Sequence, residues 1–308
     1  MDLLQRTVDR KISVSGIGLH SGKQVNMTIM PAPADAGITF VRSDLENHPE
    51  IKANIENVHS TELATTLSAN GCRISTIEHL MAAFFGLGVN NAVVEVDSPE
   101  VPIMDGSADP FVNLLKQAGI RVLDEINKVV VVTEPICVTD GDKVIRLEPS
   151  DGFKISCTID FEHPLLSNQS FCMDFSDEAF MNEIGPARTF GFLKDVTMLQ
   201  ANGLAKGASL DNAIAIDEDC VLNPDGLRYE NEFVRHKILD CIGDLSLLGY
   251  PVIGHFIAHK SGHALHHRLV TQLMAQPSAW RLAEATEFAD ISSPDWNFSP
   301  LSALHAAA

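Results

Sequence analysis

The feature that most constrains the fold is a matching order of helices, glycines and strands in the two halves of the chain. His79 and His236 stand 157 residues apart, and each lies in a segment with helical periodicity. Each segment is followed by a glycine, an apolar strand, a glycine loop and another helix. From His79 to Gly106 is 27 residues, and from His236 to Gly262 is 26. These matching intervals indicate a duplicated α+β unit.

We therefore predict an α+β fold of two tandem, related two-layer α/β sandwich domains, with helices packed between the sheets. The first domain spans 1–126 and carries His79, and the second spans 127–308 and carries His236. A chain of 308 residues is long enough for two domains of ordinary size. Two related domains that face each other bring the two histidines together, so we expect the active site at the domain interface.

Composition excludes several classes of function. Apolar residues make up 45% of the chain and charged residues 20%, which is typical of a soluble globular protein. The 41 acidic and 22 basic residues give a formal net charge of -19, which disfavours binding to nucleic acid or to an anionic lipid surface. An anionic substrate would need a local basic patch.

The chain also shows no signal for export or membrane insertion. Its N-terminus lacks the apolar core of a signal peptide, and no run approaches the roughly 18 to 20 apolar residues that span a bilayer. The six cysteines are scattered without a Cys-x-x-Cys pair, which indicates a reducing compartment. We predict a cytoplasmic protein with no stable membrane anchor.

The clearest chemical signal lies in 231–248, where apolar residues recur at three- and four-residue steps and predict an amphipathic helix. His236 and Asp240 are four residues apart and therefore share a face. With a third ligand they form the two-His-one-carboxylate set of catalytic zinc or non-haem iron. Asp244, one turn further, is placed to hold a ligand or a neighbouring imidazole. The alternative is an exposed ion pair between His236 and Asp240.

Glu78 and His79, in the predicted helix of the first half, offer a base and a third ligand. A zinc ion with three protein ligands lowers the pKa of its bound water to about 7, and a nearby carboxylate takes the proton during attack. The alternative for Glu78 is a helix cap, because 75–78 fits a capping box in which Glu78 bonds back to the Ser75 amide.

Three further segments leave alternatives open. His263 follows Gly262 in a predicted loop, where it suits oxyanion stabilisation or protonation of a leaving amine; otherwise it is a surface histidine among several neighbours, namely His255, His259, His266 and His267. The segment 188–192 suits an oxyanion contact and a sugar-stacking face, or an anchored turn. The small and apolar residues of 193–222 indicate core under a loop, or a groove for a long-chain ligand.

Six short motifs occur in order along nearly the whole chain. They are Gly16-Ile17-Gly18-Leu19-His20-Ser21-Gly22, Ser75-Thr76-Ile77-Glu78-His79-Leu80, Pro102-Ile103-Met104-Asp105-Gly106-Ser107, Arg188-Thr189-Phe190-Gly191-Phe192, His236-Lys237-x-x-Asp240 and Lys260-Ser261-Gly262-His263. Together they resemble the UDP-3-O-acyl-N-acetylglucosamine deacetylases, the zinc amidases of lipid A biosynthesis in Gram-negative bacteria. Each motif alone is weak, but the combination is highly specific.

The resemblance implies a reaction and its residues. Metal-bound water would attack the acetamide of UDP-3-O-(3-hydroxyacyl)-N-acetylglucosamine, releasing acetate and a free amine. The implied metal ligands for zinc, or for ferrous iron at the same site, are His79, His236 and Asp240. The implied catalytic residues are the general base Glu78, the general acid or electrostatic partner His263, its orienting carboxylate Asp244, and the oxyanion donor Thr189.

The resemblance also implies how a small-molecule substrate is held. The implied contacts are Phe161 on the uracil, Lys237 and Lys260 at the diphosphate, Phe190 at the glucosamine, and Leu19, His20 and Leu63 near the mouth of the site. The insert at about 193–222 would line the passage for the acyl chain. A separate hypothesis is that the small apolar tail, 304–308, is recognised by a processive protease.

Two alternative functions share parts of this pattern. A non-haem iron oxygenase uses the same ligand set, but usually on strands of a β-sandwich, and it would leave Glu78 without a task. A non-catalytic nucleotide-sugar-binding module with a structural metal would favour four protein ligands, whereas this sequence offers three. Chelation distinguishes a structural metal from a catalytic one, because loss of a structural metal unfolds a protein and loss of a catalytic metal only inactivates it.

Overall fold

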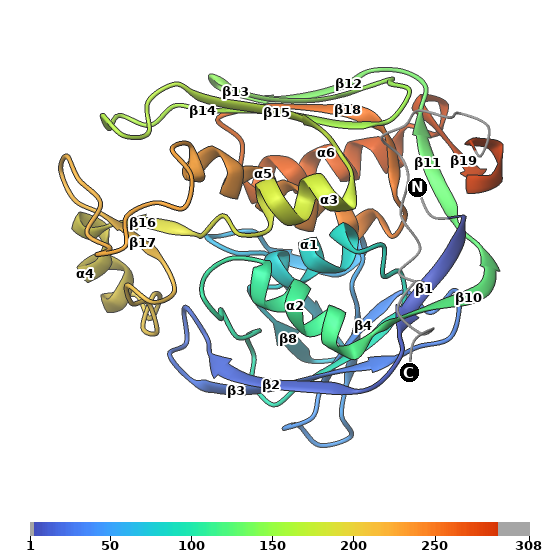
Figure 1. Cartoon of the computed structure of the whole chain (residues 1–308), viewed down its shortest axis with the longest axis horizontal. Helices are drawn as coiled ribbons and strands as arrows, with labels where there is room; N and C mark the ends of the chain where they lie inside the picture. Colours follow the sequence, from blue (N-terminus) through green and yellow to red (C-terminus); the bar gives the residue numbers. More distant parts are fainter. Residues whose placement is uncertain (1–2, 289–308) are drawn as a thin grey trace, which may run out of the picture.

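Two mixed β-sheets with helices between them form the body of the molecule (Figure 1). The structure is a computed structural model and describes residues 3–288. The α-helices are α1 (Glu78–Gly86), α2 (Asp109–Ala118), α3 (Asp177–Ala179), α4 (Leu193–Ala201), α5 (Glu232–Leu245) and α6 (His263–Ala275). Shorter helical turns are η1 (Ile55–Asn57), η2 (Phe180–Ile184), η3 (Ser246–Leu248), η4 (Pro277–Ala279) and η5 (Ala285–Phe288).

The first large sheet has five strands, in the order β2 (Ile12–Ile17), β3 (Gln24–Pro31), β9 (Ala92–Val96), β4 (Ile38–Arg42) and β5 (Glu50–Lys52). Strand β9 is antiparallel to β3 and parallel to β4. Two small sheets accompany it: β6 (Val58–Ser60), β7 (Thr66–Ala69) and β8 (Cys72–Ile74) form one, and β1 (Leu4–Val8) and β10 (Ile120–Ile126) form the other.

The second large sheet has seven strands. Five of them follow the order β12 (Ile136–Asp140), β13 (Lys143–Glu148), β18 (Val252–His259), β14 (Phe153–Ile159) and β15 (Gln169–Asp174). Strand β18 is antiparallel to β13 and parallel to β14. The other two strands are β11 (Lys128–Val132) and β19 (Trp280–Glu284).

The two large sheets therefore share one pattern of pairing. Strands β2, β3, β9, β4 and β5 have the same order and sense as β12, β13, β18, β14 and β15. In each half one helix precedes the central strand and another follows it: α1 and α2 flank β9, and α5 and α6 flank β18. The α+β class predicted from the sequence is confirmed, and this shared pattern is what a duplication produces. The division of the chain at residue 126 stays a prediction.

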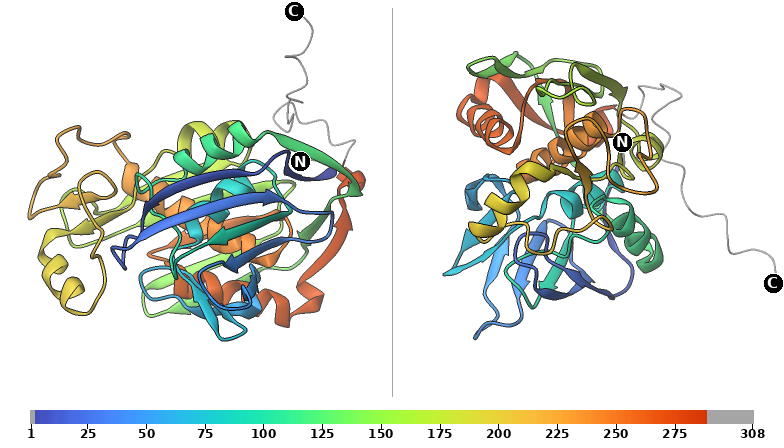
Figure 2. Two further views of the ribbon diagram at one scale, coloured as in Figure 1. Left: turned by 90° about the horizontal axis from the view of Figure 1, so that it is seen from below. Right: turned by 90° about the vertical axis from the view of Figure 1, so that its left-hand side faces the viewer.

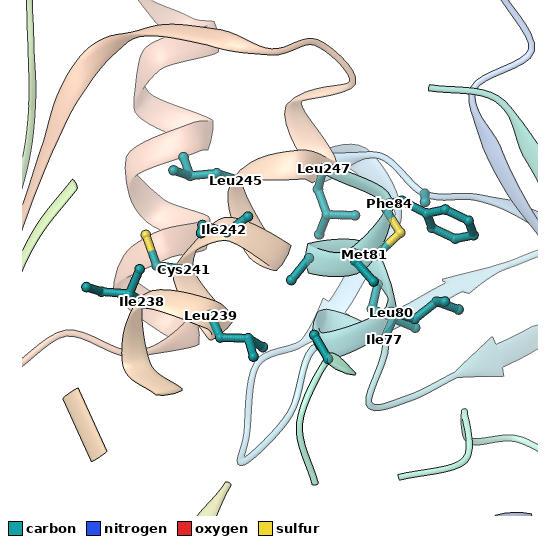
Figure 3. Close-up of a cluster of buried hydrophobic side chains, with 14 of the residues drawn as sticks. Ile77, Leu80, Met81, Phe84, Ile238, Leu239, Cys241, Ile242, Leu245 and Leu247 are labelled. Atoms are coloured by element: carbon teal, nitrogen blue, oxygen red, sulfur yellow. The ribbon is translucent and has the colours of Figure 1, made fainter. Parts of the chain in front are cut away.

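Helices α1 and α5 pack against each other in the layer between the sheets. Figure 3 shows apolar side chains that fill this region, among them Ile77, Leu80, Met81 and Phe84 around α1, and Leu239, Ile242, Leu245 and Leu247 around α5. A Cβ atom at Gly243 of α5 would lie 2.1 Å from the carbonyl oxygen of Glu78. Glycine therefore allows the first turn of α1 to lie directly against α5, since a close-packed interior has no room for another atom there.

The insert at about 193–222 projects from the body at the left of Figure 1, and Figure 2 shows it from two further sides. It contains α4 and β17 (Ile214–Ile216), which pairs in parallel with β16 (Phe190–Phe192) just before the insert. In this described segment, α4 buries none of its residues, and Leu193 and Met198 are 43% and 56% exposed. An exposed apolar helix of this kind differs from ordinary core under a loop.

Within residues 3–288, each helix is either too short or too polar to span a membrane. The tail at 304–308, for which protease recognition was predicted, lies outside the described residues.

Candidate functional site

The polar residues of α5 form a buried stripe along one side of the helix. Glu232, His236, Asp240 and Asp244 follow one another at intervals of four, and each is at most 4% exposed. The sequence predicted an amphipathic helix with His236 and Asp240 on one face, and the alternative interpretation exposed that face to water. Instead nearly all of α5 is buried, so the alternative of an exposed ion pair between His236 and Asp240 is wrong.

The first two residues of α1 meet this stripe. His79 Nε2 lies 3.5 Å from Asp240 Oδ1, and His236 Nε2 lies 3.3 Å from the same oxygen. The two imidazole rings meet edge to face, with centroids 4.9 Å apart. One ligand atom from each of the three residues lies within 4.8 Å of the others. The structure therefore brings together His79, His236 and Asp240, as the sequence predicted.

The chemistry of these three atoms fits a divalent metal ion. His236 donates its Nδ1–H to the Ala187 carbonyl at 3.0 Å, so Nε2 presents a lone pair towards Asp240. Burial lowers the pKa of His236 to about 3, which keeps the imidazole neutral. Asp240 Oδ1 is buried and has no hydrogen-bond partner among residues 3–288. Converging lone pairs around an unpaired carboxylate oxygen repel one another unless a cation binds them.

Two contacts orient His236 and Asp240, which together with His79 form the candidate metal cluster. Lys237 Nζ donates to Asp240 Oδ2 at 2.8 Å, which leaves Oδ1 to face the imidazoles. Next to Ala187, the buried Arg188 pairs with Glu232 at the start of α5, at 2.8 Å from Nε to Oε1. This ion pair joins the segment just before β16, which supplies the Ala187 carbonyl, to the helix that supplies His236. Arg188 was a candidate for an oxyanion contact, but its guanidinium is occupied inside the protein.

A second cluster of titratable groups adjoins the first. Asp244 Oδ2 accepts hydrogen bonds from His263 Nδ1 and His266 Nδ1, each at 2.7 Å. Asp244 Oδ1 accepts the hydroxyl of Thr65 at 2.5 Å. Burial raises the pKa of Asp244, but the charge and hydrogen bonds of His263 and His266 outweigh burial and hold the pKa below its ordinary value.

His263 lies between this carboxylate and Glu78. Its Nε2 is 4.0 Å from Glu78 Oε1, on the side opposite the bond to Asp244. Burial lowers the pKa of His263, but the adjacent Asp244 outweighs burial and raises it to about 10. His263 was expected in a loop after Gly262, whereas the structure makes it the first residue of α6.

Glu78 does not act as a helix cap. Helix α1 begins at Glu78 itself, and the Ser75 N–H donates to the Pro99 carbonyl at 2.9 Å. The side chain instead accepts the Thr65 N–H on Oε2 at 3.1 Å. Burial raises the pKa of Glu78, and the nearby imidazoles of His263 and His79 oppose the change. A buried carboxylate with a raised pKa beside a metal cluster has the properties of a general base.

Aromatic side chains extend from the metal cluster towards the insert. The Phe190 ring centroid is 6.2 Å from that of His236 and 6.0 Å from that of Phe161, which is 36% exposed. Lys237 Nζ lies 5.5 Å from the Phe190 centroid. Phe161 and Phe190 therefore form one apolar surface beside the cluster, with a cation at its edge.

The two predicted diphosphate contacts both have internal partners. Lys237 is bound to Asp240, and Lys260 Nζ lies 2.9 Å from Asp142 Oδ2 and 3.0 Å from Asp160 Oδ2. The hydrogen bonds that Lys260 donates to these carboxylates, and the negative charge of the carboxylates, raise the pKa of Lys260.

Leu19 and His20 lie on a loop that contacts the insert. The carbonyls of Leu19 and His20 accept N–H groups from Gly207 and Lys206 at 3.0 and 3.2 Å. Burial lowers the pKa of His20, and Glu100 opposes this change.

Leu63, two residues before Thr65, is 51% exposed. The backbone of Thr189 makes two hydrogen bonds. Its N–H donates to the Gly106 carbonyl at 2.8 Å, and its carbonyl accepts the Ile214 N–H at 2.7 Å.

Comparison with known proteins identifies the family of the chain. The model of the UDP-3-O-acyl N-acetylglycosamine deacetylase family matches residues 5–275. The chain belongs to this family. It is 54% identical over 281 residues to the UDP-3-O-acyl-N-acetylglucosamine deacetylase of Myxococcus xanthus (strain DK1622), covering 91% of this chain and 90% of that protein.

Other deacetylases named in the same way are similarly close. That of Anaeromyxobacter dehalogenans (strain 2CP-C) is 52% identical over 286 residues, covering 93% of this chain and 92% of that protein. That of Shewanella sp. (strain W3-18-1) is 51% identical over 292 residues, covering 94% and 95%. The resemblance found from the six motifs is confirmed, and membership of a deacetylase family makes this chain a hydrolase.

Two buried residues of this deacetylase-family site were not found from the sequence. His266 was grouped with surface histidines, but it is 1% exposed and bonds to Asp244. Thr65 was not singled out at all. The spacing of His266 three residues after His263 places both on one face of α6, and this was the available signal. Thr65 offers no comparable pattern, because its partners lie 13 and 179 residues away.

Proposed function

We propose that this chain removes the N-acetyl group from UDP-3-O-(3-hydroxyacyl)-N-acetylglucosamine as a zinc-dependent amidohydrolase of lipid A biosynthesis. The observation that carries the proposal is the unpaired buried oxygen of Asp240 between two imidazole nitrogens, with the carboxylate of Glu78 alongside. The printed names of the relatives support the choice of substrate. We also propose a cytoplasmic location, because the scattered cysteines indicate a reducing compartment.

His79, His236 and Asp240 would hold the metal ion. When bound, a zinc ion lowers the pKa of a water molecule and polarises a carbonyl group, and ferrous iron fits the same ligand set. The contacts of Ala187 with His236 and of Lys237 with Asp240 orient two of the three ligands before any metal arrives.

Glu78 takes the proton of the attacking water in this proposal. One of its oxygens, Oε2, is held by the Thr65 N–H, and the other, Oε1, remains to accept the proton. A raised pKa suits this task, because a carboxylate of ordinary pKa is a weak base at neutral pH. Attack forms a C–O bond at the acetamide carbon, and the tetrahedral carbon then loses its C–N bond.

His263 supplies the complementary acid. With a pKa raised to about 10 it carries a proton at neutral pH, and Asp244 fixes the orientation of its ring through Nδ1. Nε2 then gives its proton to the departing amine nitrogen, so acetate and a free amine result. Thr189 immediately precedes β16, whose first residue, Phe190, lies beside His236, and we assign the Thr189 hydroxyl to the developing oxyanion.

The aromatic surface and the insert would receive the rest of the substrate. Phe161 is exposed enough to stack on the uracil, and Phe190 would contact the glucosamine. Lys237 and Lys260 would provide positive charge for the diphosphate, and Lys260 would exchange a carboxylate partner for a phosphate. The exposed apolar side of α4 would line the passage for the acyl chain, with Leu19, His20 and Leu63 near its mouth.

The acid–base pair favours hydrolysis over the alternative functions. An oxygenase has no task for a buried carboxylate 4.0 Å from a protonated imidazole. A structural metal favours four protein ligands, whereas the chemistry of this cluster is that of three ligands with a base beside them.

The test is acetate release from UDP-3-O-(3-hydroxyacyl)-N-acetylglucosamine by the wild-type protein and by Glu78→Gln, with bound metal measured in both. We expect activity in the wild type and a loss of about 10²- to 10⁴-fold in Glu78→Gln at unchanged metal content. Absence of acetate release from metal-loaded wild type would refute the function. A Glu78→Gln variant as active as the wild type would refute the assignment of the base.

A further inference from the structure

Thr65 contacts two members of the proposed acid–base machinery through two different donors. Its backbone N–H donates to Glu78 Oε2 at 3.1 Å, and its hydroxyl donates to Asp244 Oδ1 at 2.5 Å. The hydroxyl oxygen also lies 3.4 Å from His263 Nδ1. Thr65 is 2% exposed, so water cannot readily replace these bonds if they are lost.

A short hairpin places Thr65 at this point. Strands β7 and β8 are antiparallel, with Leu67 opposite Ile74. The residue just before β7 therefore lies near the chain that leaves β8 and enters α1 at Glu78. The Thr66 hydroxyl donates to Ser75 Oγ at 3.1 Å across the same hairpin. Thr65 thus directs its hydroxyl to the site, and Thr66, the first residue of β7, directs its hydroxyl to the hairpin itself.

We propose that Thr65 is a positioning residue that fixes Glu78 and the Asp244–His263 pair relative to each other. The inference rests on the proposed deacetylase function. Holding Glu78 by Oε2 leaves Oε1 facing His263 Nε2. Holding Asp244 by Oδ1 leaves Oδ2 for His263. Thr65 thereby aligns the proposed base, Glu78 of α1, with the proposed acid, His263 of α6. The ring of His263 is itself oriented by Asp244 of α5.

The experiment compares three variants by steady-state kinetics on the same substrate, with metal content measured in each. Thr65→Val replaces the hydroxyl by a methyl group and keeps the backbone N–H. Thr65→Ser keeps the hydroxyl. Thr66→Val makes the same chemical change as Thr65→Val at the neighbouring position, where the hydroxyl does not touch the acid–base groups. Thr65→Ala replaces Thr65→Val if the latter gives no folded protein by circular dichroism.

For Thr65→Val we expect kcat to fall about tenfold, the effect of losing a hydrogen bond to a charged group, with KM and metal content unchanged. Thr65→Ser should recover most of the loss, and Thr66→Val should match the wild type. In an Asp244→Asn background, Thr65→Val should cost less than about twofold, because the hydroxyl acts through that carboxylate.

Equal kcat in Thr65→Val and Thr66→Val would overturn the inference, as would a full tenfold loss in the Asp244→Asn background. A parallel loss of metal and kcat would also overturn it. These outcomes differ from failure of the proposed function, in which the wild type itself releases no acetate.

Discussion

The buried ion pair between Arg188 and Glu232 offers a quantitative test of how the metal cluster is supported. The Glu232 side chain is 0% exposed and that of Arg188 is 9% exposed. Glu232 accepts four hydrogen bonds, three from Arg188 and one from the Arg228 N–H. The perturbation is Glu232→Gln, which keeps the shape and removes the charge.

The magnitude follows from these bonds. The glutamine side-chain oxygen can replace Oε1 of Glu232 and keep two of the four hydrogen bonds. The glutamine NH₂ group would replace Oε2, and it cannot accept the two bonds that Oε2 receives from Arg188 Nη2 and the Arg228 N–H. Breaking a buried pair by removing one charge costs about 3 to 5 kcal/mol. Because the Ala187 carbonyl orients His236, we also expect metal affinity to fall about tenfold or more.

The assay is denaturant unfolding followed by circular dichroism at fixed metal concentration, with the free energy of unfolding obtained by linear extrapolation. The matched control is Glu183→Gln, which removes a carboxylate that pairs with Arg235 but whose side chain is 47% exposed. An exposed pair contributes at most about 1 kcal/mol. Equal losses in Glu232→Gln and Glu183→Gln would refute the reasoning that burial makes the first pair important.

Three further predictions concern the site itself. Lys237→Met should weaken metal binding about tenfold, because it leaves Asp240 Oδ2 without its donor; unchanged affinity by competitive chelation would contradict this. In metal-free protein, His263 should contribute stability that is complete below its ordinary pKa of 6.5 and is lost as pH rises through about 10, since the folded protein holds the proton more tightly. Unfolding free energies of the wild type and His263→Gln should therefore converge across that window, and a constant difference would refute it. Phe161→Ala should raise KM about tenfold at unchanged kcat if the ring stacks on uracil, and a fall in kcat alone would argue against stacking.

The sequence predicted those parts of the site that depend on local geometry. His236 and Asp240 share a face because they are four residues apart on a helix, and α5 contains both of them. The matching order of the two halves also predicted that His79 and His236 would come together, and they do.

Other parts depend on how distant segments pack, which periodicity does not encode. Thr65 meets Asp244 across 179 residues, through a hairpin whose strands have only three and four residues. His266 was taken for a surface residue because its neighbourhood is rich in histidines, yet α6 turns it inwards to Asp244. Burial of α5 on nearly all sides follows from its packing against α1, α6 and the strands β14 and β15, and no property of its own sequence distinguishes it from a surface helix.

We propose that one metal ion, bound by His79, His236 and Asp240, is required for deacetylation by this chain. The most direct measurement is to remove bound metal with a chelator and follow acetate release during stepwise addition of Zn²⁺, with folding monitored throughout. We predict that the metal-free protein stays folded, is inactive, and regains full activity at about one equivalent of zinc. Undiminished activity in the metal-free protein, or unfolding when the metal is removed, would contradict the claim.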